Sequence, residues 1–254
     1  PQMFRYNNYQ YEVRFLRAYF YFNLVRQYGD VPFTDHFMSA DESNSLGRTP
    51  AKDIFDYIIS ECDEIKDLII EDYANLPADV VLPSESPETG RVNKATVLAL
   101  KARAALYAAS PLFNTENNPE LWHRAATANK ELLDYCVNNR GMKLVDDYAS
   151  LWDKNNYKNA TDELIFGRRA NKESSSMESY NYPAGIEGGK GGNCPTQNLV
   201  DAYETTDGYP VRLVDGVWKA EGSTVFNPAK PYENRDPRLK MTICVNEEVE
   251  WPTW

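Results

Sequence analysis

Histidine and cysteine are both scarce in this sequence. The two histidines, His36 and His123, lie far apart and belong to no metal-binding or nucleophile motif, so the sequence excludes a histidine-based metal or catalytic site. The four cysteines are scattered without metal-ligand spacing, at positions 62, 136, 194 and 244. Cys62 and Cys136 stand among apolar residues of predicted helices, where a buried free thiol is the usual state.

Long apolar runs and basic residues are also lacking. No stretch is long and apolar enough to cross a membrane, and no signal peptide or lipid-attachment cysteine is present. Lys and Arg number 27 against 38 Asp and Glu, which gives a net charge of −11. Because nucleic acid and anionic lipid both attract clustered cations, this balance excludes a nucleic-acid partner and argues against docking of the folded chain on an anionic membrane.

Two hydrolase motifs and the phosphate loop are missing as well. The sequence has neither a Gly-x-Ser-x-Gly nucleophile elbow nor a zinc motif. The glycine-rich stretch 185–192 is not followed by Lys-Ser or Lys-Thr, so we interpret it as an adaptable loop rather than a phosphate site. The acidic stretch 41–45 lacks the ligand alternation of a calcium loop, and we expect a solvated connection there.

Aromatic residues, in contrast, are abundant at 13%, and 17 of them are tyrosine. Rings of this kind pack between helices, or they line sites for amphipathic ligands such as sugars. The sequence alone leaves both interpretations open for any single tyrosine.

The stretch 12–32 predicts a long helix with two adjacent apolar stripes. One stripe holds Phe15, Ala18, Tyr19, Phe22 and Val25, and the second holds Leu16, Phe20 and Leu24. Two stripes make the apolar face wide, so we expect this helix to be sandwiched between others. Gly29 is placed for a left-handed C-terminal cap, and Pro32 prevents continuation.

Three further helices are predicted. One follows Thr49 as its N-cap, with an apolar stripe from Phe55 to Ile69 and with acidic residues facing solvent. An alanine-rich helix spans 94–109, and another begins at Asn118 and Pro119 and runs to residue 139. The form Arg-Ala-x-x-Tyr occurs at 17–21 and again at 103–107, as in tetratricopeptide units, where a small residue lets a second helix nest against the first.

The pattern changes after residue 142. Short strand-like runs occur at 164–166 and 211–214, and the remainder is rich in Pro, Gly, Asn and aromatics. The fold class we predict is therefore mainly α, with tetratricopeptide-like helical hairpins and an irregular, loop-rich region carrying a few short strands. We expect the helical scaffold to span 1–142 and a loop-rich ligand-binding region to span 143–254.

Several segments resemble the SusD/RagB family of surface nutrient-binding lipoproteins. The helix 15–22 followed by Tyr-Gly-Asp-Val-Pro at 28–32 is similar to the family's signature helix. Five more similar segments follow in the family's order and extend the resemblance over nearly the whole chain, at 93–114, 147–152, 163–166, 195–204 and 234–238. Against the family pattern, we expect segments to be missing at both ends.

The resemblance implies a non-catalytic role. A SusD-like protein captures oligosaccharide at the cell surface and passes it to a SusC-like TonB-dependent transporter in the outer membrane, to which a lipid anchor absent from this chain would attach it. No cofactor or metal is expected. The RagB branch implies peptide as an alternative cargo. A helical-repeat scaffold for another protein and a glycosidase are further alternatives.

Sugar binding needs flat rings for the C–H face of a pyranose and amides or charged groups for its hydroxyls. The loop-rich region offers these groups, and we select as carbohydrate-binding candidates Tyr180, Asn181, Tyr182, Trp218 and Trp251. Trp122 and Trp152 lie nearer regular elements and are expected in the core. In 234–238, Asp236-Pro237 favours a turn, and we expect the flanking arginines to bond loop carbonyls or carboxylates. Neither a catalytic residue nor a metal ligand is proposed.

Overall fold

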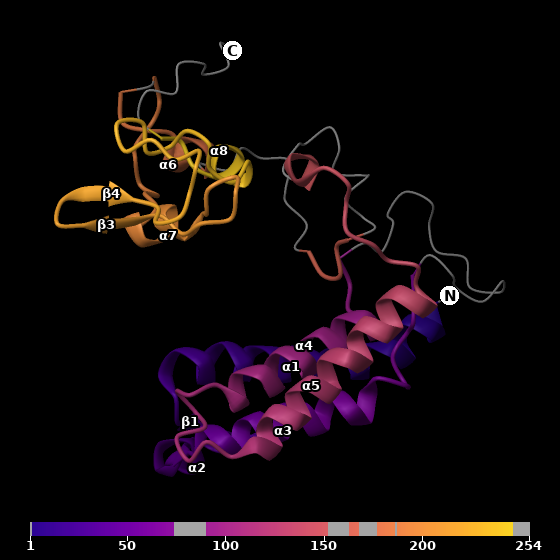
Figure 1. Ribbon diagram of the computed structural model, residues 1–254. Coiled ribbons are helices and arrows are strands. Elements are labelled where there is room, and N and C mark those ends of the chain that lie inside the picture. Colours follow the sequence, from indigo (N-terminus) through magenta and orange to yellow (C-terminus); the bar gives the residue numbers. More distant parts are fainter. Residues whose placement is uncertain (1, 74–89, 152–162, 168–176, 186, 246–254) are drawn as a thin grey trace. The chain divides into compact units, whose positions relative to one another are not determined.

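The chain folds into two compact units. The computed structural model describes residues 2–73, 90–151, 163–167, 177–185 and 187–245 (Figure 1). Unit 1 comprises Pro1–Asp146 and Lys154–Ala170, and unit 2 comprises Asp147–Asp153 and Asn171–Trp254.

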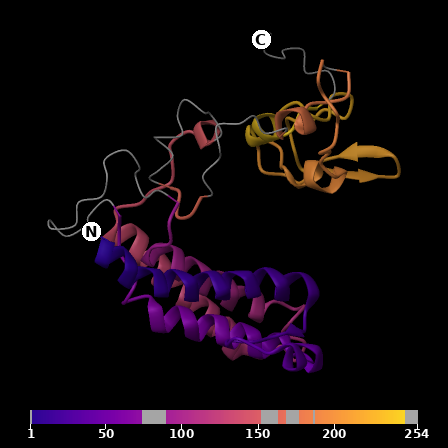
Figure 2. The same cartoon turned by 180° about the vertical axis from the view of Figure 1, so that it is seen from behind.

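Unit 1 is built on four long helices that lie side by side (Figures 1 and 2). Helix α1 packs against α3, α3 against α4, and α4 against α5. A short helix, two short strands and a π-helical turn complete the regular elements. The bounds are α1 Gln2–Tyr28, β1 Val31–Pro32, α2 Ala40–Ser45, β2 Arg48–Thr49, α3 Ala51–Ile65, α4 Lys94–Ala109, α5 Pro119–Asp134 and η1 Tyr135–Asn139.

Local signals set most helix ends. Asn93 caps α4 by accepting a hydrogen bond from Thr96 N, and Asn118 caps α5 by accepting one from Glu120 N. Gly29 adopts a φ of +67° and donates to Val25 O at 2.9 Å, which ends α1 with the expected left-handed cap. The predicted helix 94–109 and the start of the helix after Asn118 are therefore confirmed.

The start of α3 differs from the prediction. Thr49 does not cap the helix, because it pairs with Val31 in the antiparallel β1–β2 ladder. Pro50 occupies the N-cap position without a side-chain hydrogen bond. Instead, Asp30 Oδ1 accepts a hydrogen bond from Ala51 N at 2.7 Å. The strand pairing thus brings a carboxylate from the end of α1 to the start of α3, where the helix dipole favours it. The acidic stretch 41–45, expected to be a solvated connection, belongs to a short helix, α2, with a Ser39–Glu42 capping box and no buried residue.

The core of unit 1 forms between one face of α1, one face of α3 and the small and apolar residues of α4 and α5. Phe15, Ala18, Phe22 and Val25 are buried, as expected, whereas Tyr19 of the same stripe is only partly buried and packs against this core. The predicted stripe of α3 is buried throughout, at Phe55, Ile58, Ile59, Cys62, Ile65 and, just past its end, Ile69. Ala18 and Ala104, the small residues of the two Arg-Ala-x-x-Tyr segments, are fully buried. The predicted helical hairpins are therefore confirmed as the packed pairs α1–α3 and α4–α5.

The second stripe of α1 corrects the expectation of a sandwiched helix. Leu16, Phe20 and Leu24 are 38%, 60% and 42% exposed. At about 100° per residue they project from the side of α1 opposite the buried stripe. The described part of the chain covers only one side of the helix. Trp122 on α5, expected in the core, is likewise exposed, whereas Trp152 lies outside the described residues.

Ion pairs join the helices of unit 1. Lys101 on α4 is buried and contacts Asp63 Oδ1 and Glu131 Oε2, both at 2.6 Å. Lys66 contacts the same two carboxylates. Glu61 is buried and accepts from Arg14. The acidic residues of α3, expected to face only solvent, instead serve in part as inter-helix partners. Cys62 and Cys136 are buried free thiols, as predicted.

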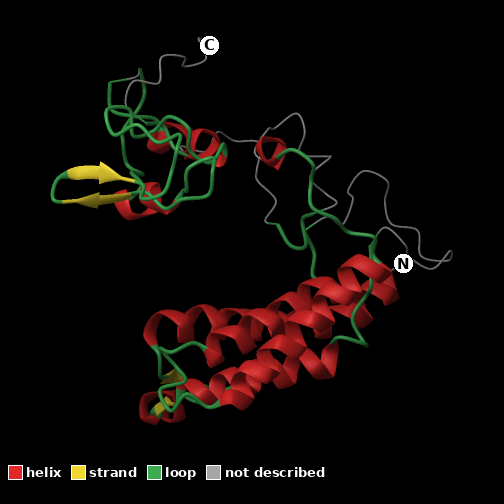
Figure 3. Cartoon of the chain, viewed as in Figure 1, coloured by secondary structure: helices red, strands yellow, loops and turns green. Residues whose placement is uncertain are grey.

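Unit 2 has short elements around a small core (Figure 3). The core consists of Val200, Leu239 and Ile243, with Tyr203, Tyr232 and Val245 packed against it. The elements are η2 Tyr148–Leu151, α6 Met177–Asn181, α7 Gln197–Ala202, β3 Arg212–Val214, β4 Val217–Lys219 and α8 Arg238–Thr242. Strands β3 and β4 form an antiparallel hairpin.

One predicted strand is confirmed and another is wrong. The run 211–214 contains β3, whereas 164–166 is an irregular segment of unit 1. Phe166 packs edge-on against the rings of Phe15 and Tyr19, at centroid distances of 6.0 and 6.3 Å. The apolar character of this run therefore reflects packing against α1 rather than strand pairing. With its packed helix pairs and two small two-stranded sheets, the chain confirms the mainly helical fold class.

Candidate functional site

Three of the predicted sugar-binding residues lie together in unit 2. Tyr180 and Asn181 end helix α6, and Tyr182 follows directly, so the first two occupy a short helix rather than the expected loop. The glycine-rich stretch folds back on them: Gly192 N and Asn193 N donate to Tyr180 O, and Gly191 N donates to Tyr182 O, at 2.9 to 3.1 Å. Asn193 Nδ2 also donates to Asn181 Oδ1 at 2.8 Å. The glycine-rich stretch is thus a hydrogen-bonded return segment.

The ring of Tyr180 packs closely on this return segment. A Cβ atom at Gly192 would lie 2.7 Å from Tyr180 Cδ1, so only glycine fits there without a shift of the ring. The ammonium group of Lys190 lies 4.7 Å from the ring centroid, within cation–π range. Tyr180 remains 46% exposed. The segment therefore holds an exposed ring beside the amide groups of Asn181 and Asn193.

The two predicted tryptophans have different outcomes. Trp218 lies on strand β4, opposite Leu213 of β3, and is half-buried. The expectation of a loop position was wrong, because the turn at Asp215 and Gly216, both with positive φ, closes a hairpin around it. Trp251 lies outside the described residues. The structure thus groups Tyr180, Asn181 and Tyr182 on one segment and places Trp218 on another element.

A cleft of about 310 Å³ lies elsewhere in unit 2. Its lining comes from η2, from α7 with the two residues that follow it, and from the start of α8 with the turn before it. The lining residues are Tyr148, Leu199, Ala202, Tyr203, Glu204, Asp236 and Arg238. Two tyrosines therefore share this cleft with two carboxylates and one guanidinium group.

A buried arginine fixes the backbone beneath the cleft. Arg235 is 6% exposed and donates to Tyr203 O, Val200 O and Pro231 O. Asp236 N donates to Glu204 O at 2.8 Å, which ties the two segments together beside Tyr203. Burial lowers the pKa of Arg235, although the residue still carries its charge at neutral pH. The expectation that this arginine bonds loop carbonyls is confirmed.

The second arginine of the motif pairs with a carboxylate. Arg238 donates through Nε and Nη2 to the carboxylate of Asp236, as was also expected for this turn. The side-chain hydrogen bond from Arg238 and the backbone N–H of the same residue lower the pKa of Asp236 to about 2. The pair is therefore ionised throughout the physiological pH range.

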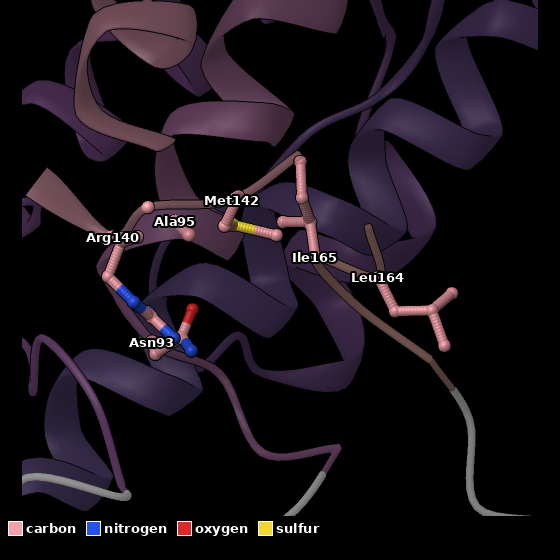
Figure 4. Close-up of a pocket in the computed structure, with 7 residues that line it drawn as sticks. Asn93, Ala95, Arg140, Met142, Leu164 and Ile165 are labelled. Carbon is pink, nitrogen blue, oxygen red and sulfur yellow. The ribbon is translucent and has the colours of Figure 1, made fainter. Parts of the chain in front are cut away.

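A smaller hollow of about 120 Å³ lies in unit 1, where Figure 4 shows Arg140 extending toward Asn93 and Met142 facing Ile165. Its polar groups already have partners. Arg140 contacts Asp72 Oδ2 at 2.9 Å and donates to Glu71 O. Asn93 Oδ1 caps α4. Because these groups serve the helix ends, we assign no ligand to this hollow.

Neither a metal cluster nor a membrane-spanning helix occurs in the part of the chain that the structure describes. There, no group of three or more His, Cys, Asp or Glu side chains is arranged to hold a metal ion. No helix in the same residues is both long and apolar enough to cross a membrane.

Comparison with known proteins finds similarity to one family. Residues 150–251 match the sequence model of the SusD family, and this range contains nearly all of unit 2. Over these residues the chain is similar to the SusD family. The resemblance inferred from the sequence motifs is therefore confirmed.

One curated relative is SusD-like protein P2 of Formosa agariphila. It is 26% identical over 181 residues, which is 70% of this chain and 30% of the relative. The chain thus spans about a third of the length of the curated relative that it matches.

Two solved structures from Bacteroides fragilis share the fold. A SusD-like protein superposes with a TM-score of 0.64 at 24% identity, over 92% of this chain and 42% of its own. A SusD-like carbohydrate binding protein superposes with a TM-score of 0.67 at 21% identity, over 91% of this chain and 39% of its own. The described chain therefore corresponds to less than half of these SusD-like structures.

The cleft residues were not among the predicted ligand contacts. Tyr148 and Tyr203 lie within the SusD-like segments 147–152 and 195–204, but those segments were used to identify the family. Arg238 was assigned only a structural role. The available signal was that each tyrosine directly neighbours an acidic residue, Asp147 or Glu204. Such pairs are common in a chain with 38 acidic residues, so the cleft could not be assembled without the fold.

Proposed function

We propose that this protein binds oligosaccharide at the cell surface and delivers it, without cleaving it, to a TonB-dependent transporter in the outer membrane. The observation that carries the proposal is that the match to the SusD family falls on unit 2, which also presents the exposed ring of Tyr180. The helices of 1–142 then serve as a support and 143–254 as the binding region.

The chemistry of the α6 segment suits a sugar. The open part of the Tyr180 ring offers a flat apolar surface for the C–H face of a pyranose. The amides of Asn181 and Asn193 and the ammonium group of Lys190 lie on the same segment, where they can reach hydroxyl groups. A half-exposed ring beside fixed polar groups is the usual composition of a small-molecule contact surface.

The partners in this proposal follow from the family alone. A SusC-like transporter receives the glycan, and a lipid anchor outside this chain holds the protein on the outer membrane. The relative described as a carbohydrate binding protein supports sugar as the cargo.

A binding screen with the full-length protein tests the proposal. Neutral hexasaccharides and mixed oligopeptides are titrated by calorimetry, and we expect saturable binding of at least one glycan. Saturable peptide binding without a glycan signal would instead support the RagB-like alternative, and binding of neither would favour a scaffold for another protein. Chromatography of the bound glycan after incubation should show an intact oligosaccharide, whereas shortened products would indicate a glycosidase.

Two variants test the predicted contacts. Tyr180→Ala and Trp218→Ala should each weaken glycan binding about two- to ten-fold, the range of a single ring contact. Tyr180→Phe keeps the ring and should bind nearly as well as the wild type. Unchanged affinity in both alanine variants would remove these residues from the site.

A further inference from the structure

We infer that the cleft between η2, α7 and α8 is a second sugar contact and holds one neutral pyranose residue of a bound glycan. The inference rests on the proposed function for the class of ligand, but it concerns residues other than the predicted Tyr180 segment and Trp218. It names Tyr148, Tyr203 and Arg238 as the groups that contact the sugar.

The size of the cleft limits what it can hold. Its volume of about 310 Å³ is at the lower end of the range of roughly 300 to 1,000 Å³ for small-molecule sites. One six-membered sugar ring fits such a volume, whereas an oligosaccharide of several residues needs more. The ligand is therefore a single residue of a longer chain that continues into solvent.

The walls provide an apolar surface. Tyr148 and Tyr203 are half-buried, and Leu199 is 48% exposed in the same cleft. Tyr203 also packs against the core of unit 2, so its ring has a fixed support. Tyr148 O–H lies 3.5 Å from Thr242 Oγ1, which brings η2 next to the end of α8. Rings held in this way present a surface for the C–H groups of a pyranose.

The polar groups of the cleft have bonding capacity left for hydroxyls. Arg238 donates through its backbone N, Nε and Nη2 to Asp236, while Nη1 makes no hydrogen bond within the described residues. The Arg238 side chain is 62% exposed. The hydrogen-bonded pair of Asp236 and Arg238 holds a carboxylate acceptor and a guanidinium donor in fixed positions. Two neighbouring hydroxyl groups of a sugar can donate to the first and accept from the second.

The site is preorganised by Arg235. Its bonds to Tyr203 O and Val200 O, together with the Asp236 N to Glu204 O bond, fix the backbone on both sides of the cleft. A ligand would not have to order this backbone on binding, which lowers the entropic cost. Arg235 lies beneath the cleft and does not line it, so it is a positioning residue.

The charge of the cleft selects against acidic sugars. Asp236 neutralises Arg238, and the exposed carboxylate of Glu204 leaves the lining with an excess of one negative charge. The whole chain carries −11. A uronic acid or sulfated sugar would meet repulsion at short range, so the ligand is neutral.

Amide hydrogen exchange of the full-length protein tests the location without any substitution. Maltohexaose, cellohexaose, xylohexaose and mannohexaose are the probes, and hexagalacturonate is the acidic comparison. We expect at least one neutral probe to protect segments 147–151 and 199–206, and the acidic probe to protect neither. Protection confined to 178–193 would overturn the cleft but leave the proposed function standing. Binding of no neutral probe would overturn both.

Variants test the contacts. Tyr148→Ala should weaken binding of the neutral probe by about five-fold or more, and Tyr148→Phe should restore most of it, because the ring supplies the contact. Tyr28→Ala, which removes a 65% exposed tyrosine at the end of α1, is the matched control and should bind as the wild type does. Equal affinities for Tyr148→Ala and Tyr28→Ala would contradict the inference. Unchanged thermal unfolding of each variant shows that the fold is intact.

Discussion

Arg235 donates two hydrogen bonds to the carbonyl oxygen of Tyr203, from Nη2 at 2.5 Å and from Nε at 3.2 Å. A third and a fourth bond reach Val200 O and Pro231 O. One buried side chain thus donates hydrogen bonds to backbone carbonyl oxygens at the end of α7 and in the turn before α8. These bonds lie next to the small core of Val200, Leu239 and Ile243.

Replacing this side chain should destabilise unit 2. Arg235→Met removes the donor of Tyr203 O and Pro231 O, whereas Val200 O still accepts from Tyr203 N. We expect a loss of about 2–4 kcal/mol in the free energy of unfolding. Arg235→Lys should recover only part of it, because an ammonium group cannot reproduce the planar fork. Arg238→Met, at an exposed position, is the control. Denaturant unfolding monitored by near-ultraviolet circular dichroism gives the values, and equal stability of the two methionine variants would contradict this role.

Phe20 and Phe22 form a matched pair on α1. Phe22 is 2% exposed and Phe20 is 60% exposed. Phe22→Ala should cost about 3–5 kcal/mol because it opens a cavity in the core of unit 1, whereas Phe20→Ala should change stability by less than about 0.5 kcal/mol. Urea unfolding of this 254-residue chain measures the change in the free energy of unfolding for each variant. A similar cost for both substitutions would mean that the outer stripe of α1 is packed after all.

The Lys101 ion pairs predict a pH dependence. Burial alone would raise the pKa of Asp63 and of Glu131, but hydrogen bonds from Lys101 and Lys66 outweigh it and lower both values. Groups with lowered pKa values stabilise the fold above their unfolded pKa of about 4 and lose that contribution as the pH falls through the folded values. Lys101→Met should therefore cost about 1 kcal/mol near neutral pH, since the carboxylates are partly exposed, and less as the pH falls below about 4.

Lys130→Met is the control for this experiment, because Lys130 pairs with Asp134 at the surface of α5 and is 73% exposed. It should change stability little at any pH. A cost for Lys101→Met that stays constant from neutral to acid pH would show that the side chain acts through packing rather than through its charge.

Gly192 supports Tyr180 by leaving space for its ring. Gly192→Ala places a methyl group against Tyr180 Cδ1, so the ring must move from its present position. We expect glycan binding at the α6 segment to weaken about two- to ten-fold, as for loss of one ring contact. Gly47→Ala is the control, since a Cβ there has nothing within 4 Å. Calorimetric titration of both variants with the glycan measures the effect. Full affinity in Gly192→Ala would show that glycan binding does not depend on the present position of the Tyr180 ring.

Sequence patterns predicted the features that depend on near neighbours in the chain. The bounds of α4 followed from the Asn93 cap and the apolar periodicity, and the end of α1 followed from Gly29. The cap of α3 did not follow, because the pairing of Val31 with Thr49 decides it and places Asp30 beside Ala51. Periodicity also predicted that the second stripe of α1 is apolar, but it could not tell whether another element covers that stripe.

The candidate sites show the same limit. The Tyr180 segment was predicted because its polar and aromatic residues are adjacent in the sequence. The cleft brings Tyr148 together with Tyr203 and Arg238 from separate segments of the chain. The spacing of these residues in the sequence does not predict that they lie close together. Likewise, the partners of Lys101 lie on two other helices.

Arg235 holds its four bonds to carbonyl oxygens, which neither gain nor lose protons in water. The helix bundle of unit 1, by contrast, is joined by carboxylates that lose their charge in acid. A drop in external pH should therefore loosen the bundle well before it disturbs the backbone around Tyr203. The backbone around Tyr203, which we expect to contact nutrients, would therefore keep its conformation at acid pH. The reason is that its hydrogen bonds do not depend on a titrating group, whatever the total stability of unit 2.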